Sequence, residues 1–198
     1  MARGGVSESK SKVLASVALL GGLAFTLRIA VDFPFPLASY LSLEVWEIPA
    51  YLALFIYGVR RGIAVAFTVF LLVQAFATGL PAGPLYNFIA VLSTMVGVFT
   101  ITRATGKSIH DFFKSRKMAI ASVVSSAITR ILLMTIVNAI VLPLPIPIGF
   151  RIPPAALPPV LAVTAIFNGT VAVYSVAIAL LLASRIPPSV TGIYRQKI

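Results

Sequence analysis

Long apolar runs separated by short polar segments dominate the chain. They lie at about residues 13–31, 46–59, 62–79, 84–103, 117–142 and 158–184. Most approach the ~20 apolar residues with which a helix crosses the ~30 Å hydrocarbon layer of a membrane. The second run is short, and Pro49 falls near its start, where a helix tolerates proline. The pattern predicts an all-α membrane protein with six transmembrane helices, in a single domain that covers residues 1–198.

The composition agrees with this pattern. Of the 198 residues, 59% are hydrophobic and only 11% are charged, against about 25% charged in a typical soluble domain. Six membrane spans leave no room for a sizeable aqueous domain. The absence of cysteine and the single histidine exclude disulfide frameworks, thiolate metal sites and cysteine nucleophiles, so we predict no metal site.

The net charge of +11 would suggest a nucleic-acid partner in a soluble protein. In a membrane protein, Lys and Arg are retained in cytoplasmic loops. If both termini are cytoplasmic, Arg151 is the only basic residue that lies clearly on the outer side of the membrane, and the acids Asp32, Glu44 and Glu47 fall on that side as well. We therefore expect a multi-pass protein of the cell membrane without a nucleic-acid partner. The basic residues on the cytoplasmic side are then Arg3, Lys10, Lys12, Arg60, Arg61, Arg103, Lys107, Lys114, Arg116, Lys117, Arg185, Arg195 and Lys197.

A proline-rich segment separates the last two apolar runs. It extends from Leu142 to Pro159 and holds half of the 14 prolines. Because proline cannot extend a helix and prefers extended or turn geometry, we expect a stiff loop here, on the outer side.

Catalytic motifs are not supported by their context. Gly106-Lys107-Ser108 resembles the end of a phosphate-binding loop, but Ile101 stands where that motif requires glycine. The single histidine, His110, lies in a charged cytoplasmic segment, away from any buried serine. Every carboxylate falls in a loop or at the end of a span, which weakens a proton-coupled carrier as well. We therefore predict that the chain is not an enzyme.

Amide side chains gather toward the outer half of the predicted helices. Asn87, Asn138 and Gln74 lie near outer ends, and Asn168 lies deeper in the last span. Buried amides either join helices by hydrogen bonds or line a cavity in which a ligand completes them. Their concentration toward one side favours a pocket that opens outward.

Arg130 lies near the middle of the fifth span and should cost several kcal/mol there unless it is paired or hydrated. Its partner is either helix carbonyls, a loop carboxylate such as Glu47, or an anionic or carbonyl-rich ligand. Arg130, Met134 and Asn138 recur at four-residue steps and share a helix face. Arg28 and Asp32, one turn apart, are expected to pair locally.

Small residues form a seam along the first span. Such residues allow close approach of another helix, either within the chain or from a partner subunit. The seam comprises Ala15, Ala18, Gly21, Gly22 and Ala24.

These residues resemble a known family, the substrate-binding S components of energy-coupling factor (ECF) vitamin transporters, and most closely its riboflavin-binding branch. The resemblance covers the chain in order: residues 22–25 (GLAF), 32–36 (DFPFP), 41–50 (LSLEVWEIPA), the turn at Tyr57-Gly58, residues 83–88 (GPLYNF), Asn138, and the pair Phe167-Asn168.

The resemblance implies a protein without a cofactor that binds a vitamin as cargo in an outer cavity capped by loops. Its partners would be a transmembrane coupling subunit, docked on Ala15, Ala18, Gly21 and Gly22, and two cytoplasmic ATPases. The expected ligand-binding residues are Asn87, Asn138, Asn168, Arg130, Glu47 and Gln74, with Trp46 and Tyr40 closing the site.

One position departs from the riboflavin-binding pattern. Riboflavin binders often carry lysine three positions after the asparagine of the last helix, and Val171 stands there. A flavin ring would still suit the aromatic set Phe35, Tyr40, Trp46, Tyr51, Tyr86 and Phe150. Riboflavin is therefore the favoured cargo, and pantothenate is an alternative if Arg130 binds a carboxylate. A membrane enzyme and a purely structural subunit are the rivals from other classes.

Overall fold

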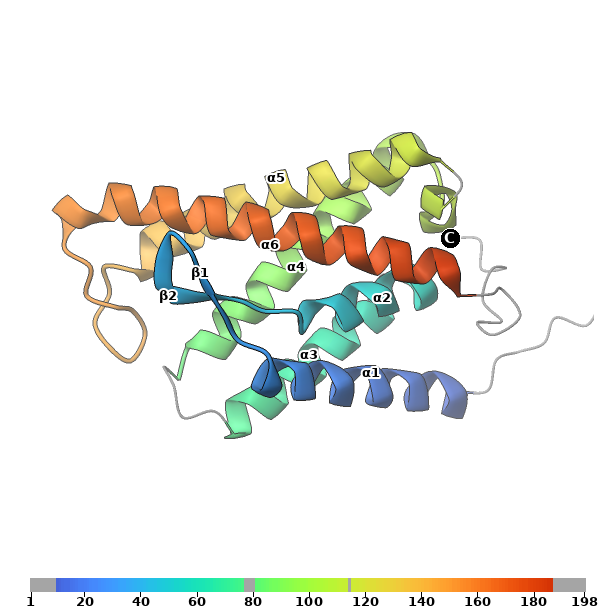
Figure 1. Ribbon diagram of the computed structural model, residues 1–198, viewed down its shortest axis with the longest axis horizontal. Helices are drawn as coiled ribbons and strands as arrows, with labels where there is room; N and C mark the ends of the chain where they lie inside the picture. Colours follow the sequence, from blue (N-terminus) through green and yellow to red (C-terminus); the bar gives the residue numbers. More distant parts are fainter. Residues whose placement is uncertain (1–9, 77–80, 114, 187–198) are drawn as a thin grey trace, which may run out of the picture.

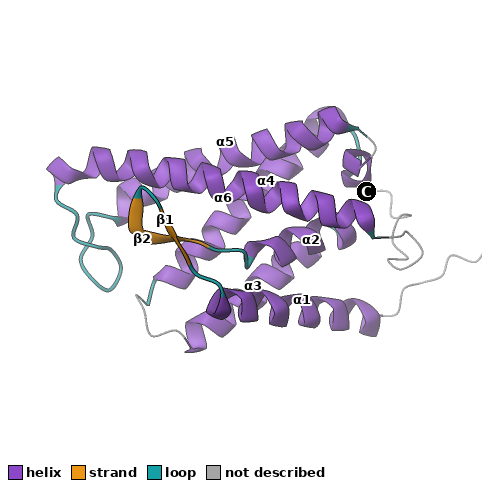
Figure 2. Ribbon diagram, in the orientation of Figure 1, coloured by secondary structure: helices purple, strands orange, loops and turns teal. Residues whose placement is uncertain are grey.

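The computed structural model describes residues 10–76, 81–113 and 115–186, and six α-helices with one β-hairpin form its architecture (Figures 1 and 2). Arg3, Lys114, Arg195 and Lys197, among the basic residues assigned above to the cytoplasmic side, lie outside the described residues, as do positions 77–79 of the third predicted span. The elements are α1 (Lys10–Ala30), β1 (Phe33–Phe35), β2 (Ala38–Leu43), α2 (Glu47–Tyr57), α3 (Val59–Phe76), α4 (Gly83–Thr105), η1 (Ile109–Phe113), α5 (Arg116–Val141), η2 (Pro154–Ala156) and α6 (Leu157–Arg185).

Each predicted apolar run contains a helix, displaced by a few residues at most. Within the described residues, α3, α4, α5 and α6 are long and apolar enough to cross a membrane. The apolar part of α1, Leu14–Ala30, is shorter than that criterion, and α2 has only 11 residues, or about 16 Å of helix rise. Proline at position 49 falls in the first turn of α2, as expected.

The helices pack in two groups. α5 packs against α4 and α6, whereas α1 packs against α3 and α2, and α2 connects the groups through its contact with α6 (Figure 1). Gly97 permits the close approach of α4 to α5, since an added Cβ would lie 2.4 Å from the Cα of Ser126. Ser125 also donates a 3.0 Å hydrogen bond to the Gly97 carbonyl.

The hairpin is an element that the apolar pattern did not predict. β1 and β2 pair antiparallel, with Phe33 opposite Leu43 and Pro34 opposite Ser42. Phe35 at the end of β1 is buried, and its ring meets that of Phe167 on α6 edge to face at 5.4 Å. This contact holds the hairpin against the helices.

Two ends of the molecule differ in character. The hairpin and the proline-rich loop between α5 and α6 lie at one end, where that loop includes a cis peptide bond between Ile146 and Pro147 (Figure 1). The start of α1, the end of α6 and η1 lie at the other end. We refer to these as the hairpin end and the η1 end.

Candidate functional site

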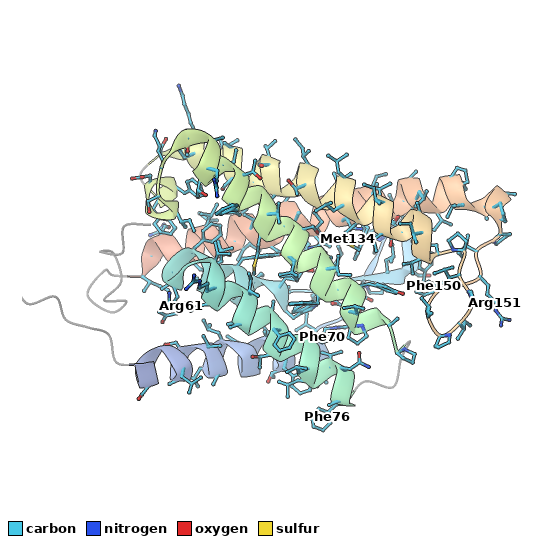
Figure 3. All side chains as sticks on the ribbon, turned by 180° about the vertical axis from the view of Figure 1, so that it is seen from behind. Arg61, Phe70, Phe76, Met134, Phe150 and Arg151 are labelled. Atoms are coloured by element: carbon cyan, nitrogen blue, oxygen red, sulfur yellow. The ribbon has the colours of Figure 1, made fainter. Side chains whose placement is uncertain are left out.

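A cavity of about 570 Å³ opens at the hairpin end. Its wall is built from α4, α5 and α6, with contributions from α1, α3, strand β2 and the proline-rich loop. In Figure 3, Met134 of α5 and Phe150 of the loop lie toward this end, and Arg61 lies near the opposite end. The volume falls within the ~300–1,000 Å³ of typical small-molecule sites.

Arg130 forms the polar floor of this cavity and is 3% exposed. Its guanidinium makes a two-point ion pair with Glu47, in which Nη1 lies 2.5 Å from Oε2 and Nη2 lies 2.9 Å from Oε1. Its Nε donates a 3.0 Å hydrogen bond to Oδ1 of Asn168. Weaker contacts at 3.4 Å reach the hydroxyl groups of Tyr51 and Thr94. The fifth helix is thereby connected to α2, α4 and α6 at one point.

Of the partners considered for Arg130, the structure selects the loop-side carboxylate. Glu47 is the first residue of α2, yet it is buried, and the Tyr51 hydroxyl also donates a 2.8 Å hydrogen bond to its Oε2. The positive charge of Arg130 is neutralised by a partner that is itself buried, which is how a membrane interior tolerates a cation. The cavity floor therefore presents hydrogen-bonding groups without a net charge.

Two asparagines on the cavity wall have side-chain amides without a hydrogen-bond partner among the described residues. Asn87 of α4 and Asn138 of α5 line the cavity, and within the described ranges no hydrogen bond joins either amide to another residue. Asn168 differs, because its Oδ1 accepts from Arg130 and its Nδ2 donates to the Thr164 carbonyl at 2.8 Å. The amides of Asn87 and Asn138 are available to a ligand.

Arg28 lies on the cavity wall and pairs with Glu44, at 2.6 Å between Nη1 and Oε1. The local pair with Asp32 predicted from the sequence is therefore wrong: the turn after α1 leaves Asp32 exposed, and the segment after β2 brings Glu44 to the guanidinium. Trp46 Nε1 also donates to Glu44. Burial nevertheless raises the pKa of Glu44 to about 7, because desolvation outweighs the attraction of Arg28.

Aromatic residues form part of the cavity opening. The Tyr86 hydroxyl on α4 donates a 2.5 Å hydrogen bond to the Ile148 carbonyl, which ties the proline-rich loop to α4. Phe150 and Tyr40 line the cavity while remaining largely exposed, at 51% and 68%. The proline-rich loop and the hairpin thus supply the aromatic surface around the cavity opening.

The structure brings together five of the eight side chains predicted to bind ligand, namely Asn87, Asn138, Asn168, Arg130 and Tyr40. The other three lie elsewhere. Glu47 pairs with Arg130 beneath the wall, Gln74 is exposed on α3, and Trp46 is buried beside Glu44, where it borders a smaller pocket. Among the described residues, no cluster of acids or histidines could hold a metal ion.

Sequence reasoning missed Thr164 and Arg28 as cavity residues. Thr164 stands four residues before Asn168 and so shares its helix face, a signal that was available in the sequence. Arg28 carried no such signal, because its ion-pair partner Glu44 follows a hairpin that the apolar pattern did not predict.

The small-residue seam of α1 divides between two faces. Ala15, Ala18 and Gly22 are exposed, and nothing lies within 4 Å of a Cβ built on Gly22. Gly21 is buried, and its added Cβ would lie 2.9 Å from Cγ2 of Thr68 on α3. Ala15, Ala18 and Gly22 therefore form a smooth outer face of α1, whereas Gly21 is part of the internal packing between α1 and α3.

The fold of the chain is similar to that of a solved membrane transport protein. The structure resembles that described as "Structure and mechanism of the S component of a bacterial ECF transporter", with a TM-score of 0.58 over 89% of this chain and 90% of that chain, at 24% sequence identity. The fold is therefore that of an ECF transporter S component. No protein-family model matches the chain.

Two curated relatives define the branch. The chain is 32% identical to "Riboflavin transporter RibU" of Staphylococcus aureus (strain TCH60) over 138 residues, which are 69% of this chain and 68% of that protein. It is 40% identical to "Riboflavin transporter FmnP" of Bacillus subtilis (strain 168) over 85 residues, 44% of that protein. The chain belongs to the RibU branch of ECF S components, a family of membrane transporters and not of enzymes.

Proposed function

We propose that the protein captures riboflavin in the cavity at the hairpin end and presents it for ATP-driven uptake by partner subunits. The observation that carries this proposal is a cavity of about 570 Å³ whose wall holds two amides without a partner in the part of the chain that the structure describes. The chain is also a relative of two riboflavin transporters. Riboflavin is cargo in this proposal and not a cofactor.

The wall chemistry suits a flavin. A flavin ring is flat and largely apolar, and its pyrimidine edge alternates carbonyl acceptors with one N–H donor. Met134, Phe167 and Leu142 supply apolar wall surface, and the free amide of Asn138 offers both a donor and an acceptor. Few placed polar groups in an apolar pocket are typical of sites that orient small molecules.

Val171 does not weaken the proposal. It is 2% exposed and is not part of the cavity wall. Arg130 reaches Asn168 from α5, so a guanidinium that is paired with Glu47 lies beside this asparagine at the cavity floor. Glu47 already pairs with that cation, so Arg130 has no unpaired charge with which to select the carboxylate of pantothenate, which favours riboflavin as the cargo.

The charge distribution supports six spans with both termini on the cytoplasmic side of the cell membrane. Arg103 and Arg185 occupy the last turns of α4 and α6, and Arg60 and Arg116 the first turns of α3 and α5. These ends lie together at the η1 end, whereas the acidic residues Asp32 and Glu44 follow α1 and β2 at the hairpin end. In this orientation the cavity opens outward.

Partner docking is assigned to the exposed face of α1. Ala15, Ala18 and Gly22 leave its backbone accessible, and small side chains allow a second helix to approach closely in lipid. We propose that a transmembrane coupling subunit, which works with two cytoplasmic ATPases, contacts this face.

Substitution of Asn138 tests the site. Asn138→Leu should weaken riboflavin binding at least about tenfold, because a ligand acceptor and donor lose their partner. Gln74→Leu makes the same kind of change on α3 outside the cavity and should leave binding unchanged. Equilibrium titration of both purified variants measures the difference; equal affinities would remove Asn138 from the site.

A further inference from the structure

The cavity wall has two polar regions. One is the floor, where Arg130, Thr164 and Asn168 project from α5 and α6. The other consists of Arg28 on α1 and Asn87 on α4. Since α1 packs against α2 and α3, on the far side of the bundle from α5 (Figure 1), Arg28 faces the cavity from the other group of helices than the floor. Asn87 lies on α4, between Arg28 and α5 in this arrangement of helices.

The Arg28–Asn87 region continues into a side pocket. Both residues, with Val73 and Pro84, border the cavity and also a small space of about 10 Å³ lined by Trp46 and Phe88, enough for about one water molecule. The wall at Arg28 is therefore open to the cavity and backed by aromatic packing.

Arg28 retains hydrogen-bonding capacity that the protein does not use. Glu44 accepts from Nη1, but Nε is buried without a partner in the described part of the chain. The Glu44 carboxyl, whose pKa burial raises to about 7, is charged only part of the time at neutral pH. With the unpartnered amide of Asn87, this side of the cavity presents several donors and one acceptor. Buried polar groups are normally satisfied. The Nε atom itself is enclosed, so a ligand in the cavity would meet the accessible part of the Arg28 guanidinium and the half-buried amide of Asn87.

A flavin vitamin has two polar parts that differ in chemistry. The pyrimidine edge of the ring is a rigid, flat array that suits amides such as Asn138. The sugar-alcohol chain is flexible, and its hydroxyl groups both donate and accept. A guanidinium beside a free amide suits several neighbouring hydroxyl groups, because one side chain only donates and the other does both.

We propose that Arg28 and Asn87 form a subsite for the polyol chain of the cargo, in the part of the cavity that borders the smaller pocket. This assignment rests on the proposed function and specifies which part of the ligand each polar region recognises. Arg28 acts as a specificity-determining residue that distinguishes a flavin with a polyhydroxyl chain from the same ring without one.

Two flavins separate the subsite from the ring site. Riboflavin carries the polyol chain, and lumiflavin carries a methyl group at the same ring position. The double variant Arg28→Met/Glu44→Gln removes the guanidinium without leaving an unpaired carboxylate behind. It should weaken riboflavin binding at least about tenfold and change lumiflavin binding less than about twofold. Asn87→Leu should show the same selectivity, and Arg28→Lys should recover part of the riboflavin affinity.

The matched control is Arg185→Met, which removes an exposed arginine at the η1 end and should change neither affinity. The proposal is overturned if the double variant weakens both flavins equally, which would indicate a structural role for Arg28, or if it weakens neither. If the unaltered protein binds neither flavin, the proposed function itself fails, and that result is distinct from loss of selectivity.

Discussion

The buried pair of Arg130 and Glu47 should behave as a single energetic unit. Their side chains are 3% and 5% exposed, and three hydrogen bonds of 3.0 Å or less hold the guanidinium. Arg130→Met would leave Glu47 buried without its cation, and Glu47→Gln would leave Arg130 without its anion. Removing one partner of a buried ion pair costs about 3 to 5 kcal/mol, whereas replacing both is often nearly neutral.

These values translate into a measurable shift. A chain of 150 to 250 residues loses roughly 2 to 4 °C of melting temperature per kcal/mol, so each single variant should melt about 6 to 20 °C below the unaltered protein. The double variant Arg130→Met/Glu47→Gln should recover most of that loss. The resulting coupling free energy between the two sites should be at least about 2 kcal/mol, within the range of residues in contact.

Circular dichroism melts of the four proteins in detergent, without ligand, measure this cycle. Arg185→Met serves as the control, because an exposed arginine should contribute within about 0.5 kcal/mol. Additive single effects, or single variants that melt within about 1 °C of the unaltered protein, would refute the view that Arg130 and Glu47 neutralise one another inside the helix bundle.

Two further predictions concern α1 and the carboxyl group of Glu44. Gly22→Leu should abolish transport while riboflavin binding persists, because this position faces open space. Gly21→Leu should instead reduce the yield of folded protein, because the new side chain would collide with Thr68. Uptake and binding assays distinguish the two variants, and normal uptake by Gly22→Leu would contradict docking at this position. The raised pKa of Glu44, about 7 against an ordinary 4.5, means that the folded state holds a proton more tightly than the unfolded chain. The free energy of unfolding should therefore fall by at most about 3 kcal/mol as the pH rises from about 5 to 8, and the melting temperature should fall with it. Glu44→Gln should flatten this pH dependence. An unchanged slope in that variant would assign the titration to another group.

The parts of the fold that follow from local pattern could be predicted from the sequence. Each apolar run became a helix, because a long apolar segment that satisfies its own backbone is stable in lipid. The amides at positions 87, 138 and 168 line one cavity; the concentration of amides toward one half of the predicted helices indicated such a pocket, although Asn168 lies deeper. The face shared by Arg130, Met134 and Asn138 is the face of α5 that lines this cavity.

The parts that depend on non-local contacts could not be predicted in this way. The hairpin of β1 and β2 has only three and six residues in its strands, too short for an alternating pattern to stand out beside the helices. Its placement decides that Arg28 meets Glu44 instead of Asp32, and that Trp46 lies in the core and not over the cavity. Gln74 has an amide side chain like the asparagines of the site, but it lies on a face of α3 that does not line the cavity.

Trp46 provides the most direct test of the central claim that the cavity holds a flavin. It is the only tryptophan in the chain, it is buried, and it borders the pocket that shares Arg28 and Asn87 with the cavity. Riboflavin added to the purified protein should quench tryptophan fluorescence until one flavin is bound per chain and then no further. Quenching that continues without saturation, as it would with free tryptophan in the same detergent, would contradict a riboflavin site at the hairpin end.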